Sequence, residues 1–421
     1  MQPLAELTTT TLRLATAGSV DDGKSTLIGR LLLDTKQLFD DQLEALESGE
    51  LAHMTDGLRA EREQGITIDV AYRFFATPNR SFIIADTPGH VRYTRNMVTG
   101  ASTADAALVL VDARNGIVEQ SRRHASIAAL LGIRHAIACV NKMDLVDFSE
   151  ERFREIEADF VAMAERLGIE DARAIPLSAL EGDNVVDASA RTPWFSAPPL
   201  LEQLETLEVV REDRDGEMVR FPVQLTIRDT DYRGYAGRVA GGVLNVGDEI
   251  VVLPARERST IARIDTPGGP ADSVAAPLTA TVVLADELDV GRGDMIVSPD
   301  RQPSVARHIE ATICWMAEAP LRAGARLELK HTTRRVRATI EEIQSRVDMA
   351  TLDSVEDPGE LALNDIGRVR VRVSNPLPAE PYAANRVTGA FILVDEGTNE
   401  TVGAGMVARG AKPGTLVPSG G

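Results

Sequence analysis

A glycine-rich segment near the amino end has the residue types and spacing of a loop that holds phosphate groups. Residues 18–25 read Gly-Ser-Val-Asp-Asp-Gly-Lys-Ser and fit the pattern G-x-x-x-x-G-K-[ST]. Gly18 and Gly23 permit torsions that turn backbone N–H groups onto a phosphate, and the following helix adds partial positive charge. Lys24 can reach the β- and γ-phosphates of a nucleotide, and the Ser25 hydroxyl can bind Mg²⁺. The predicted phosphate-binding residues are Gly18, Ser19, Val20, Asp21, Asp22, Gly23, Lys24, Ser25 and Thr26. A glycine turn with an incidental lysine is the alternative.

A second segment has the features of a switch that senses the third phosphate. It reads Asp86-Thr87-Pro88-Gly89-His90 and follows an apolar run. Asp86 can hold Mg²⁺ through a water molecule, and Gly89 lets a backbone N–H approach the γ-phosphate. Upstream, the Thr67 hydroxyl can bind Mg²⁺ while its N–H touches the γ-phosphate; both contacts vanish on hydrolysis. A plain strand residue is the alternative for Thr67. We expect residues 34–66 to be mobile without nucleotide.

His90 completes the predicted catalytic set. Its imidazole can orient the attacking water, although many loop histidines are merely solvated. The predicted catalytic residues are His90, Thr67 and Gly89, and the predicted metal ligands are Ser25, Thr67 and, through water, Asp86.

Two further segments point to guanine as the base. Asn141-Lys142-Met143-Asp144 follows an apolar run, and the Asp144 carboxylate can accept hydrogen bonds from guanine N1–H and N2–H₂, which adenine does not offer in that arrangement. Asn141 can brace the phosphate loop, and the Lys142 stem can lie over the ring. Ser178-Ala179-Leu180 can present N–H groups to guanine O6. These segments together predict GTP and Mg²⁺ as ligands.

The elements around these motifs alternate. Short apolar runs at residues 82–85, 107–111 and 136–140 are typical of strands buried on both faces of a parallel sheet. Helical patterns cover residues 24–33, 119–131 and 150–167, and a short one covers 200–207. This alternation predicts an α/β nucleotide-binding domain with a mostly parallel sheet over residues 1–210.

The pattern changes after an acidic linker at residues 211–216. Residues 243–253 predict two strands around a Gly-Asp turn, and residues 368–373 alternate arginine with valine. Such short strands predict two antiparallel β-barrels, at residues 217–302 and 303–410. Residues 411–421 are expected to be a disordered tail.

Composition limits the classes of function. The chain has 421 residues, 45 Lys and Arg against 64 Asp and Glu, and a net charge of −19. This balance argues against a general nucleic-acid coat and against an anionic membrane surface. A basic stretch at residues 330–337 can meet phosphate or be a solvated barrel strand. Two distant cysteines and no signal-like amino end favour the cytoplasm, and no apolar run is long enough for a membrane span.

The four motifs in this order resemble a GTPase with the core of translation factors, and residues 237–253 and 388–405 resemble the two barrels of elongation factors of the Tu/1A kind. The segments 56–73, 176–186 with 193–195, 220–224 with 232–237, and 315–318 are similar to a narrower family, the large GTP-hydrolysing subunit of bacterial heterodimeric ATP sulfurylase (sulfate adenylyltransferase). The resemblance runs from about residue 9 to residue 409.

This resemblance implies a partner. A catalytic small subunit would form adenosine 5′-phosphosulfate and pyrophosphate from ATP and sulfate, as the first step of sulfate activation for cysteine synthesis, and this chain would couple that reaction to GTP hydrolysis. Some relatives carry a fused adenylylsulfate kinase, which we do not expect here because Gly23-Lys24 is the only Gly-Lys pair. Neither nucleic acid nor membrane is an expected partner. The alternatives are an elongation factor that binds aminoacyl-tRNA and a scaffold that binds GTP without turning it over.

Overall fold

The computed structural model describes residues 11–35, 67–209, 218–230 and 232–408. The predictions for the linker at 211–216, for the tail at 411–421 and for nearly all of the segment 34–66 lie outside these residues. The chain forms two compact units, one of residues 1–209 with 349–352 and one of residues 210–348 with 353–421. Among the described residues, no helix is both long and apolar enough to cross a membrane.

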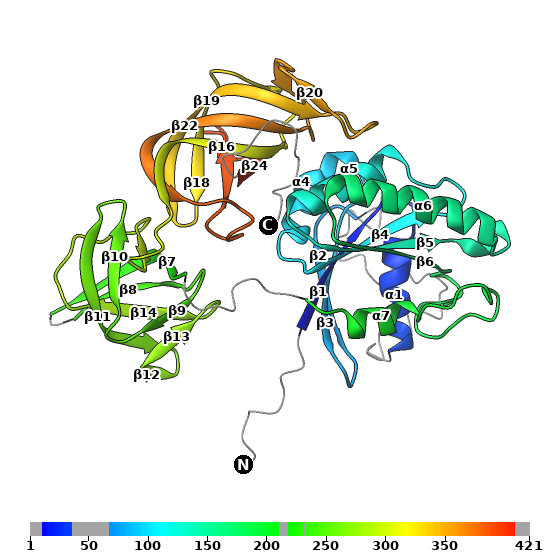
Figure 1. The fold of residues 1–421 in the computed structure, drawn as a ribbon, viewed down its shortest axis with the longest axis horizontal. Coiled ribbons are helices and arrows are strands. Elements are labelled where there is room, and N and C mark those ends of the chain that lie inside the picture. Colours follow the sequence, from blue (N-terminus) through cyan, green and yellow to red (C-terminus); the bar gives the residue numbers. More distant parts are fainter. Residues whose placement is uncertain (1–10, 36–66, 210–217, 231, 409–421) are drawn as a thin grey trace, which may run out of the picture. The chain divides into compact units, whose positions relative to one another are not determined.

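The first unit is an α/β domain built on one six-stranded sheet (Figure 1). The strand order is β2-β3-β1-β4-β5-β6, and only β2 runs antiparallel to its neighbour. The strands are β1 Thr11–Ala17, β2 Ala71–Ala76, β3 Ser81–Asp86, β4 Ala106–Asp112, β5 His135–Asn141 and β6 Asp171–Pro176. The predicted mostly parallel sheet is confirmed, and the antiparallel edge strand β2 is an addition to it.

Helices cover both faces of this sheet. In Figure 1, α1 and α7 lie on one face, and α4, α5 and α6 lie on the other. The helices are α1 Lys24–Asp34, α4 Thr94–Ala101, α5 Glu119–Leu130, α6 Glu150–Leu167 and α7 Leu200–Thr206, with short 3₁₀ turns η2 Val91–Tyr93 and η3 Met143–Val146. Because both faces are covered, all seven residues of β4 are buried, as the continuous apolar run required.

Parallel strands bring the predicted motifs to one edge of the sheet. Gly18 follows β1, Asp86 ends β3, Asn141 ends β5, and Ser178 comes shortly after β6. The carboxyl ends of parallel neighbours meet at the same edge, where ligands of α/β sheets bind. Four segments that are far apart in sequence therefore converge.

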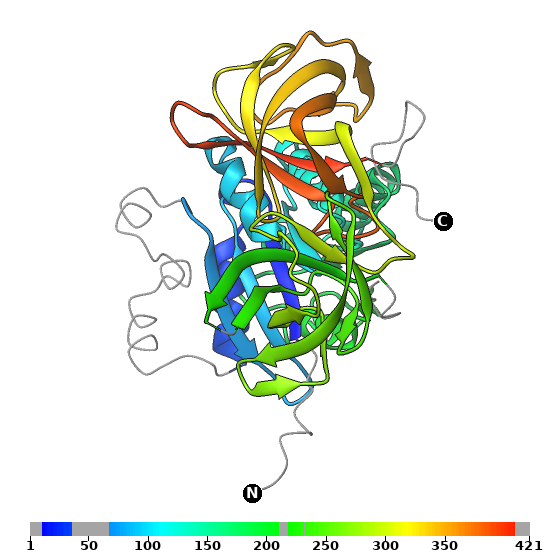
Figure 2. The same cartoon turned by 90° about the vertical axis from the view of Figure 1, so that its left-hand side faces the viewer.

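The second unit contains two closed antiparallel barrels, whose curved strands Figure 2 shows from the side. In the first, strands β10, β15, β7, β8, β14 and β11 follow one another, and the β10–β11 pairing closes the ring. Its strands are β7 Arg220–Asp229, β8 Tyr232–Arg238, β9 Val243–Asn245, β10 Glu249–Leu253, β11 Glu257–Thr266, β12 Gly269–Ala271, β13 Ser273–Ala275, β14 Thr279–Leu284 and β15 Met295–Val297. The two strands predicted within residues 243–253 exist as β9 and β10, but β9 pairs with β13 and β10 pairs with β11 and β15.

The second barrel closes in the same way through the β18–β19 pairing. Its strands are β16 Ser304–Trp315, β17 Leu321–Arg322, β18 Arg326–His331, β19 Arg334–Val347, β20 Ser354–Glu356, β21 Glu360–Leu361, β22 Ile366–Ala379, β23 Ala390–Val394 and β24 Thr401–Val407. On β22 the valines 369, 371 and 373 are buried while Arg370 and Arg372 are exposed. The alternation in the sequence therefore confirms which face meets the core.

A buried ion pair joins the two barrels. Arg220 of β7 donates to the Glu380 carboxylate at 2.9 and 2.8 Å, and both side chains are almost fully buried. The Thr388 hydroxyl also donates to Glu380. Removing one partner of such a pair leaves a buried charge, at a cost of about 3–5 kcal/mol.

Candidate guanine-nucleotide site

The phosphate loop has the backbone geometry that its glycines were expected to allow. Gly18 and Gly23 have φ values of 144° and 91°, and Asp21 is also left-handed at 67°. A Cβ at Gly23 would overlap the side-chain nitrogen of Asn141, so glycine is required there by contact as well as by torsion. Helix α1 starts at Lys24 with no side-chain cap and no acid in its first turn. Its amino end is thus open to an anion.

Lys24 is held inside this loop. Its Nζ donates to the carbonyl oxygens of Gly18 and Ser19 at 3.1 and 2.7 Å. Burial lowers the pKa of Lys24, although Asp86, Asp22 and Asp21 oppose the effect. A buried ammonium lacks hydration, so it attracts phosphate strongly even though these carboxylates offset part of its charge.

Gly89 of the predicted switch lies directly against the loop. A Cβ at Gly89 would come within 2.5 Å of Lys24 Nζ and 2.8 Å of the Gly18 carbonyl oxygen. Thr87 and Pro88 are buried, and the Thr87 hydroxyl donates to the Thr16 carbonyl at 2.5 Å. The structure therefore brings the phosphate loop and the residues 86–89 together.

Asp86 and Ser25 face each other next to Lys24. The Ser25 hydroxyl donates to one Asp86 carboxylate oxygen at 3.4 Å, and the Thr16 hydroxyl donates to the other at 3.3 Å. Burial raises the pKa of Asp86 to about 6, with Lys24 acting in the opposite direction. A cation would relieve this carboxylate, and hydroxyl and carboxylate oxygens are the donors that Mg²⁺ prefers, so the pair fits that ion.

Thr67 and His90 are less buried than Lys24 and Asp86. Thr67 is half-buried in irregular backbone ahead of β2, so the alternative that it is a strand residue is wrong. The His90 side chain is exposed, and its Nδ1 accepts from the Arg92 N–H at 3.2 Å. That contact directs the other ring nitrogen, Nε2, away from the backbone. The catalytic roles of both residues stay predictions.

Asn141 links the base end of the site to the phosphate end. Its Nδ2 donates to the Asp22 carbonyl at 2.8 Å, and its Oδ1 accepts from the Ala179 N–H at 2.9 Å. Asp22 in turn accepts from the Ser19 N–H at 2.5 Å through its carboxylate. Asn141 is buried and its amide bonds both partners, so one side chain fixes the spacing of two loops.

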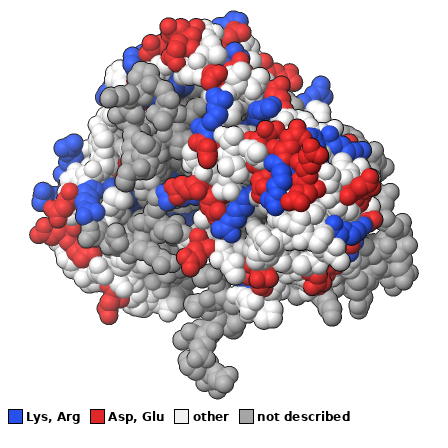
Figure 3. All heavy atoms as spheres, turned by 45° about the vertical axis from the view of Figure 1, so that its right-hand side comes forward, with Lys and Arg blue, Asp and Glu red and all other residues white. Residues whose placement is uncertain are grey.

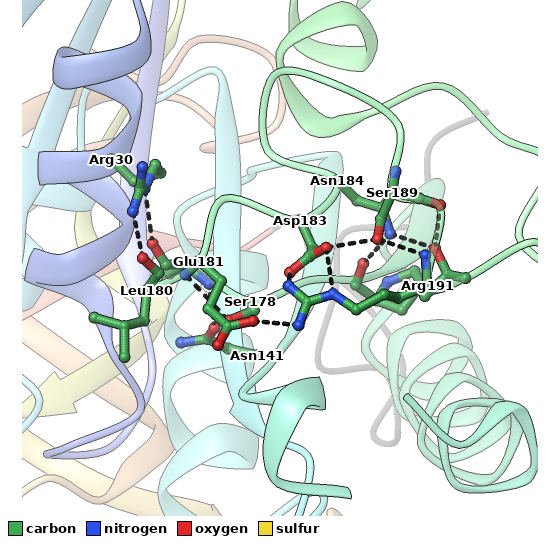
Figure 4. A network of polar contacts seen from close by, with 12 residues as sticks. Arg30, Asn141, Ser178, Leu180, Glu181, Asp183, Asn184, Ser189 and Arg191 are labelled. Carbon is green, nitrogen blue, oxygen red and sulfur yellow. Dashed lines mark hydrogen bonds and ion pairs between the residues drawn. The ribbon is translucent and has the colours of Figure 1, made fainter. Parts of the chain in front are cut away.

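The loop of Ser178, Ala179 and Leu180 is braced from two sides (Figure 4). Arg30 of α1 donates to the carbonyl oxygens of Ala179, at 3.2 Å, and Leu180. Arg191 pairs with the carboxylates of Asp183 and Glu181 on the other side. The Ala179 N–H donates to Asn141 and the Ser178 N–H to the Asp183 carbonyl, so the Leu180 N–H is the one in this loop with no partner among the described residues.

Lys142 and Asp144 occupy the remaining side of the base end. Lys142 Nζ lies 3.0 Å from an oxygen of Asp112, which Arg114 also contacts at 2.6 Å. Burial alone would raise the pKa of Asp112, but hydrogen bonds from Arg114 and Lys142 outweigh it and hold that pKa well below its usual range. The Lys142 head is thereby anchored, which fixes the direction of its aliphatic stem. Asp144 is half-buried; the hydrogen bond and charge of Asp112 raise the pKa of Arg114, and Asp144 adds to that effect.

Comparisons with known proteins agree with this geometry. Residues 9–211 match the elongation factor Tu GTP binding domain, and residues 308–408 match the GTP-eEF1A C-terminal domain-like family. The chain is 50% identical to sulfate adenylyltransferase subunit 1 of Bacteroides fragilis, over 94% of this chain and 85% of that one. It is 53% identical to the bifunctional enzyme CysN/CysC of Mycobacterium tuberculosis, over 98% of this chain and 69% of that one.

The chain belongs to the sulfate adenylyltransferase subunit 1 family.

A solved structure of sup35 complexed with GDP is also similar, with a TM-score of 0.45 and 23% identity over 96% of this chain and 94% of that one.

Several residues at this family member's site were missed from the sequence. None of Arg30, Arg114, Arg191 and His124 was singled out from the sequence. Arg30 lies two turns into α1 on the side that faces residues 179 and 180, which only the fold reveals. For His124 a signal existed, because Gln120 precedes it by four residues on a helix that follows a site strand.

Proposed function

We propose that this chain is the GTPase subunit of a sulfate adenylyltransferase and that it couples GTP hydrolysis to formation of adenosine 5′-phosphosulfate on a partner catalytic subunit. The observation that carries the proposal is a single site in which Asn141 ties the phosphate loop to the predicted guanine-selecting loop. The chain that holds this site is 50% identical to a subunit 1 protein. The name "subunit 1" implies a partner, and the small subunit would hold ATP and sulfate.

Each predicted residue has a role in this proposal. Lys24 and the amino end of α1 bind the β- and γ-phosphates, and Asn141, Asp144 and the loop of residues 178–180 select guanine. Ser25, Thr67 and, through water, Asp86 would hold Mg²⁺, which neutralises charge on the phosphates during transfer. His90 orients the attacking water. Gly89 and Thr67 report the presence of the γ-phosphate to the rest of the chain.

Coupling requires an energy difference between the GTP and GDP states. Moving an equilibrium from 1:99 to 99:1 needs about 5.5 kcal/mol of differential affinity. Charge-assisted hydrogen bonds from Lys24, Thr67 and Gly89 to the γ-phosphate are worth about 1.5–3 kcal/mol each, and they exist only before hydrolysis. Their sum is of the required order.

The basic stretch at residues 330–337 was the sequence feature that most favoured the elongation-factor alternative, and the structure pairs several of its arginines with acidic residues. Within the basic stretch 330–337, Arg334 pairs with Asp294 at 3.2 Å, Arg335 with Glu328 at 2.8 Å, and Arg337 with Glu396 at 3.4 Å. Figure 3 shows the same mixing of blue and red side chains on the face that it presents. The acidic partners offset the positive charge of this stretch, so it is better explained as a solvated barrel strand and turn.

The deciding experiment is reconstitution with a small subunit. We expect a second polypeptide to co-purify and adenylylsulfate to form faster with GTP than with GDP or with a non-hydrolysable analogue. The Asp144→Asn chain is the matched control, because it should lose stimulation by GTP and regain it with XTP. Equal adenylyl-transfer rates with GTP and GDP would contradict coupling, and absence of GTP turnover in the complex would leave the scaffold alternative.

A further inference from the structure

Helix α5 places two side chains with no assigned role next to the phosphate loop and the switch. His124 is fully buried, and the Gly18 N–H donates to its Nδ1 at 2.9 Å. Burial, with Lys24 and Arg123 nearby, lowers the pKa of His124 to about 3, so the ring is neutral near pH 7. Because Nδ1 accepts, a neutral ring must carry its proton on Nε2.

The Gln120 side-chain amide lies between three groups that make conflicting demands. Its Nε2 donates to the Gly89 carbonyl at 3.3 Å, and its Oε1 accepts from Arg123 Nη1 at 3.0 Å. The same Nε2 lies 2.7 Å from Nε2 of His124. In this orientation the amide N–H faces the ring N–H. Turning the amide by half a rotation gives His124 an acceptor but sets the amide oxygen against the Gly89 carbonyl oxygen, so one amide cannot satisfy both.

We propose that Gln120 and His124 form a two-position relay, in which the amide of Gln120 bonds Gly89 in one state of the switch and His124 in the other. His124 ties the relay to the phosphate loop through Gly18, and Gln120 ties it to the switch. Two mutually exclusive bonding arrangements of one group are what a two-state element needs. Both are positioning residues, since they act through Gly18 and Gly89.

The packing of Gly89 makes the relay responsive to phosphate. Gly89 fits so closely over Lys24 and Gly18 that even a Cβ has no room. A γ-phosphate that draws the Gly89 N–H toward itself displaces the carbonyl of the same residue, which removes the acceptor that holds the amide. The amide then turns to the ring proton of His124. The inference rests on guanine-nucleotide binding at this site and is independent of sulfate chemistry.

Two substitutions with opposite expected signs test the relay in the purified chain. Gln120→Glu has only acceptors, so it favours His124 and repels the Gly89 carbonyl; the ratio of GTP to GDP affinity should rise about fivefold. His124→Asn keeps an acceptor for the Gly18 N–H but lacks the Nε2 proton, so the amide stays on Gly89; the ratio should fall about fivefold. Ser121→Ala is the matched control, because this buried hydroxyl of α5 has no hydrogen-bond partner among the described residues.

Opposite shifts of the ratio, with melting temperatures close to that of Ser121→Ala, support the relay. Shifts in the same direction, or ratios unchanged within about twofold, overturn it. If a variant does not fold, nitrogen-15 NMR spectra of the wild-type chain provide the test. The chemical shifts of His124 Nε2 and of the Gln120 side-chain amide should differ between the GDP form and a GTP-analogue form. Identical spectra overturn the relay. Such a failure in a chain that still binds GTP would leave the proposed function standing.

Discussion

The base end and the phosphate end of the site are built in different ways. At the base end, Asn141, Arg30 and Arg191 brace the predicted base-binding loop of residues 178–180 with several side-chain bonds. At the phosphate end, the carbonyl of Gly89 accepts from Gln120 at 3.3 Å, and the donor has a competing neighbour.

This difference follows from what each end must recognise. The base is the same before and after hydrolysis, so rigid bracing costs nothing in turnover and lowers the entropy lost on binding. The γ-phosphate is present in one state and gone in the next, so groups that contact it need two arrangements of similar free energy. Substitutions at the two ends should therefore differ in which property they change.

The largest effect is expected at the phosphate end from Lys24→Ala. This substitution removes a buried ammonium that bonds two phosphates, so the affinities for GTP and for GDP should both fall by about 100-fold or more. Lys142→Ala at the base end is the comparison and should lower both affinities by about tenfold, since it removes the stacking of the stem and the contact with Asp112 but no bond to phosphate. Fluorescent-nucleotide titration measures both, and similar losses for the two lysines would erase the distinction between the ends.

Asp144→Asn should change which base the site prefers, without changing how well the site distinguishes a triphosphate from a diphosphate. GTP affinity should fall by about 100-fold and XTP affinity should rise, because the amide donor matches the carbonyl at C2 of xanthine. The ratio of triphosphate to diphosphate affinity should stay the same within about twofold. Competition binding with XTP and XDP measures this, and no gain in XTP use would contradict the assignment of Asp144.

His90→Ala should lower the rate of GTP hydrolysis and leave the affinity for GTP unchanged. The exposed imidazole touches neither the phosphate loop nor the base loop in the described residues, so GTP binding should be spared while hydrolysis slows about tenfold or more. Single-turnover hydrolysis is the measurement, with Arg92→Ala as control for the local loop. An unchanged rate would remove His90 from the mechanism.

Arg30→Met tests whether bracing of the base loop matters. The methionine keeps the packing of the stem but cannot donate to Ala179 and Leu180, so affinity for GTP and GDP should fall equally, by about fivefold. Arg154→Met on α6, where the arginine pairs with Glu150 and Glu157 on the surface, is the matched control. A larger loss of affinity for GTP than for GDP would mean that Arg30 supports the phosphate end of the site instead.

Two aspartates should respond to pH with opposite signs. The pKa of Asp86 is raised to about 6, so between pH 4 and pH 6 the folded chain binds more protons than the unfolded chain, and its stability falls as pH rises. The pKa of Asp112 is lowered, so its contribution is present above the unfolded pKa and is lost as pH falls. At pH 7.5 without nucleotide, Asp86→Asn should raise the melting temperature and Asp112→Asn should lower it, each by a few degrees, roughly. Shifts of the same sign would contradict the assigned environments.

Sequence alone predicted the elements around the motifs because their signals are local. The apolar runs, the helix that begins at Lys24 and the alternation on β22 each depend on neighbours within a few residues. The edge strand β2 escaped prediction because it follows directly on the switch segment and only one of its six residues is buried. The partners of β9 and β10 escaped because strand pairing depends on the closure of the whole barrel.

The sequence by itself predicted a phosphate loop, a switch and a guanine-selecting loop, since each is a short run in which residue type and spacing indicate the chemistry. Only the tertiary structure decided what supports them. Arg30 meets Leu180 across 150 residues, and Gly18 meets His124 across 106. Contacts between residues so far apart produce no periodic pattern in the sequence. They depend on which helix faces lie against the sheet edge and not on any local preference.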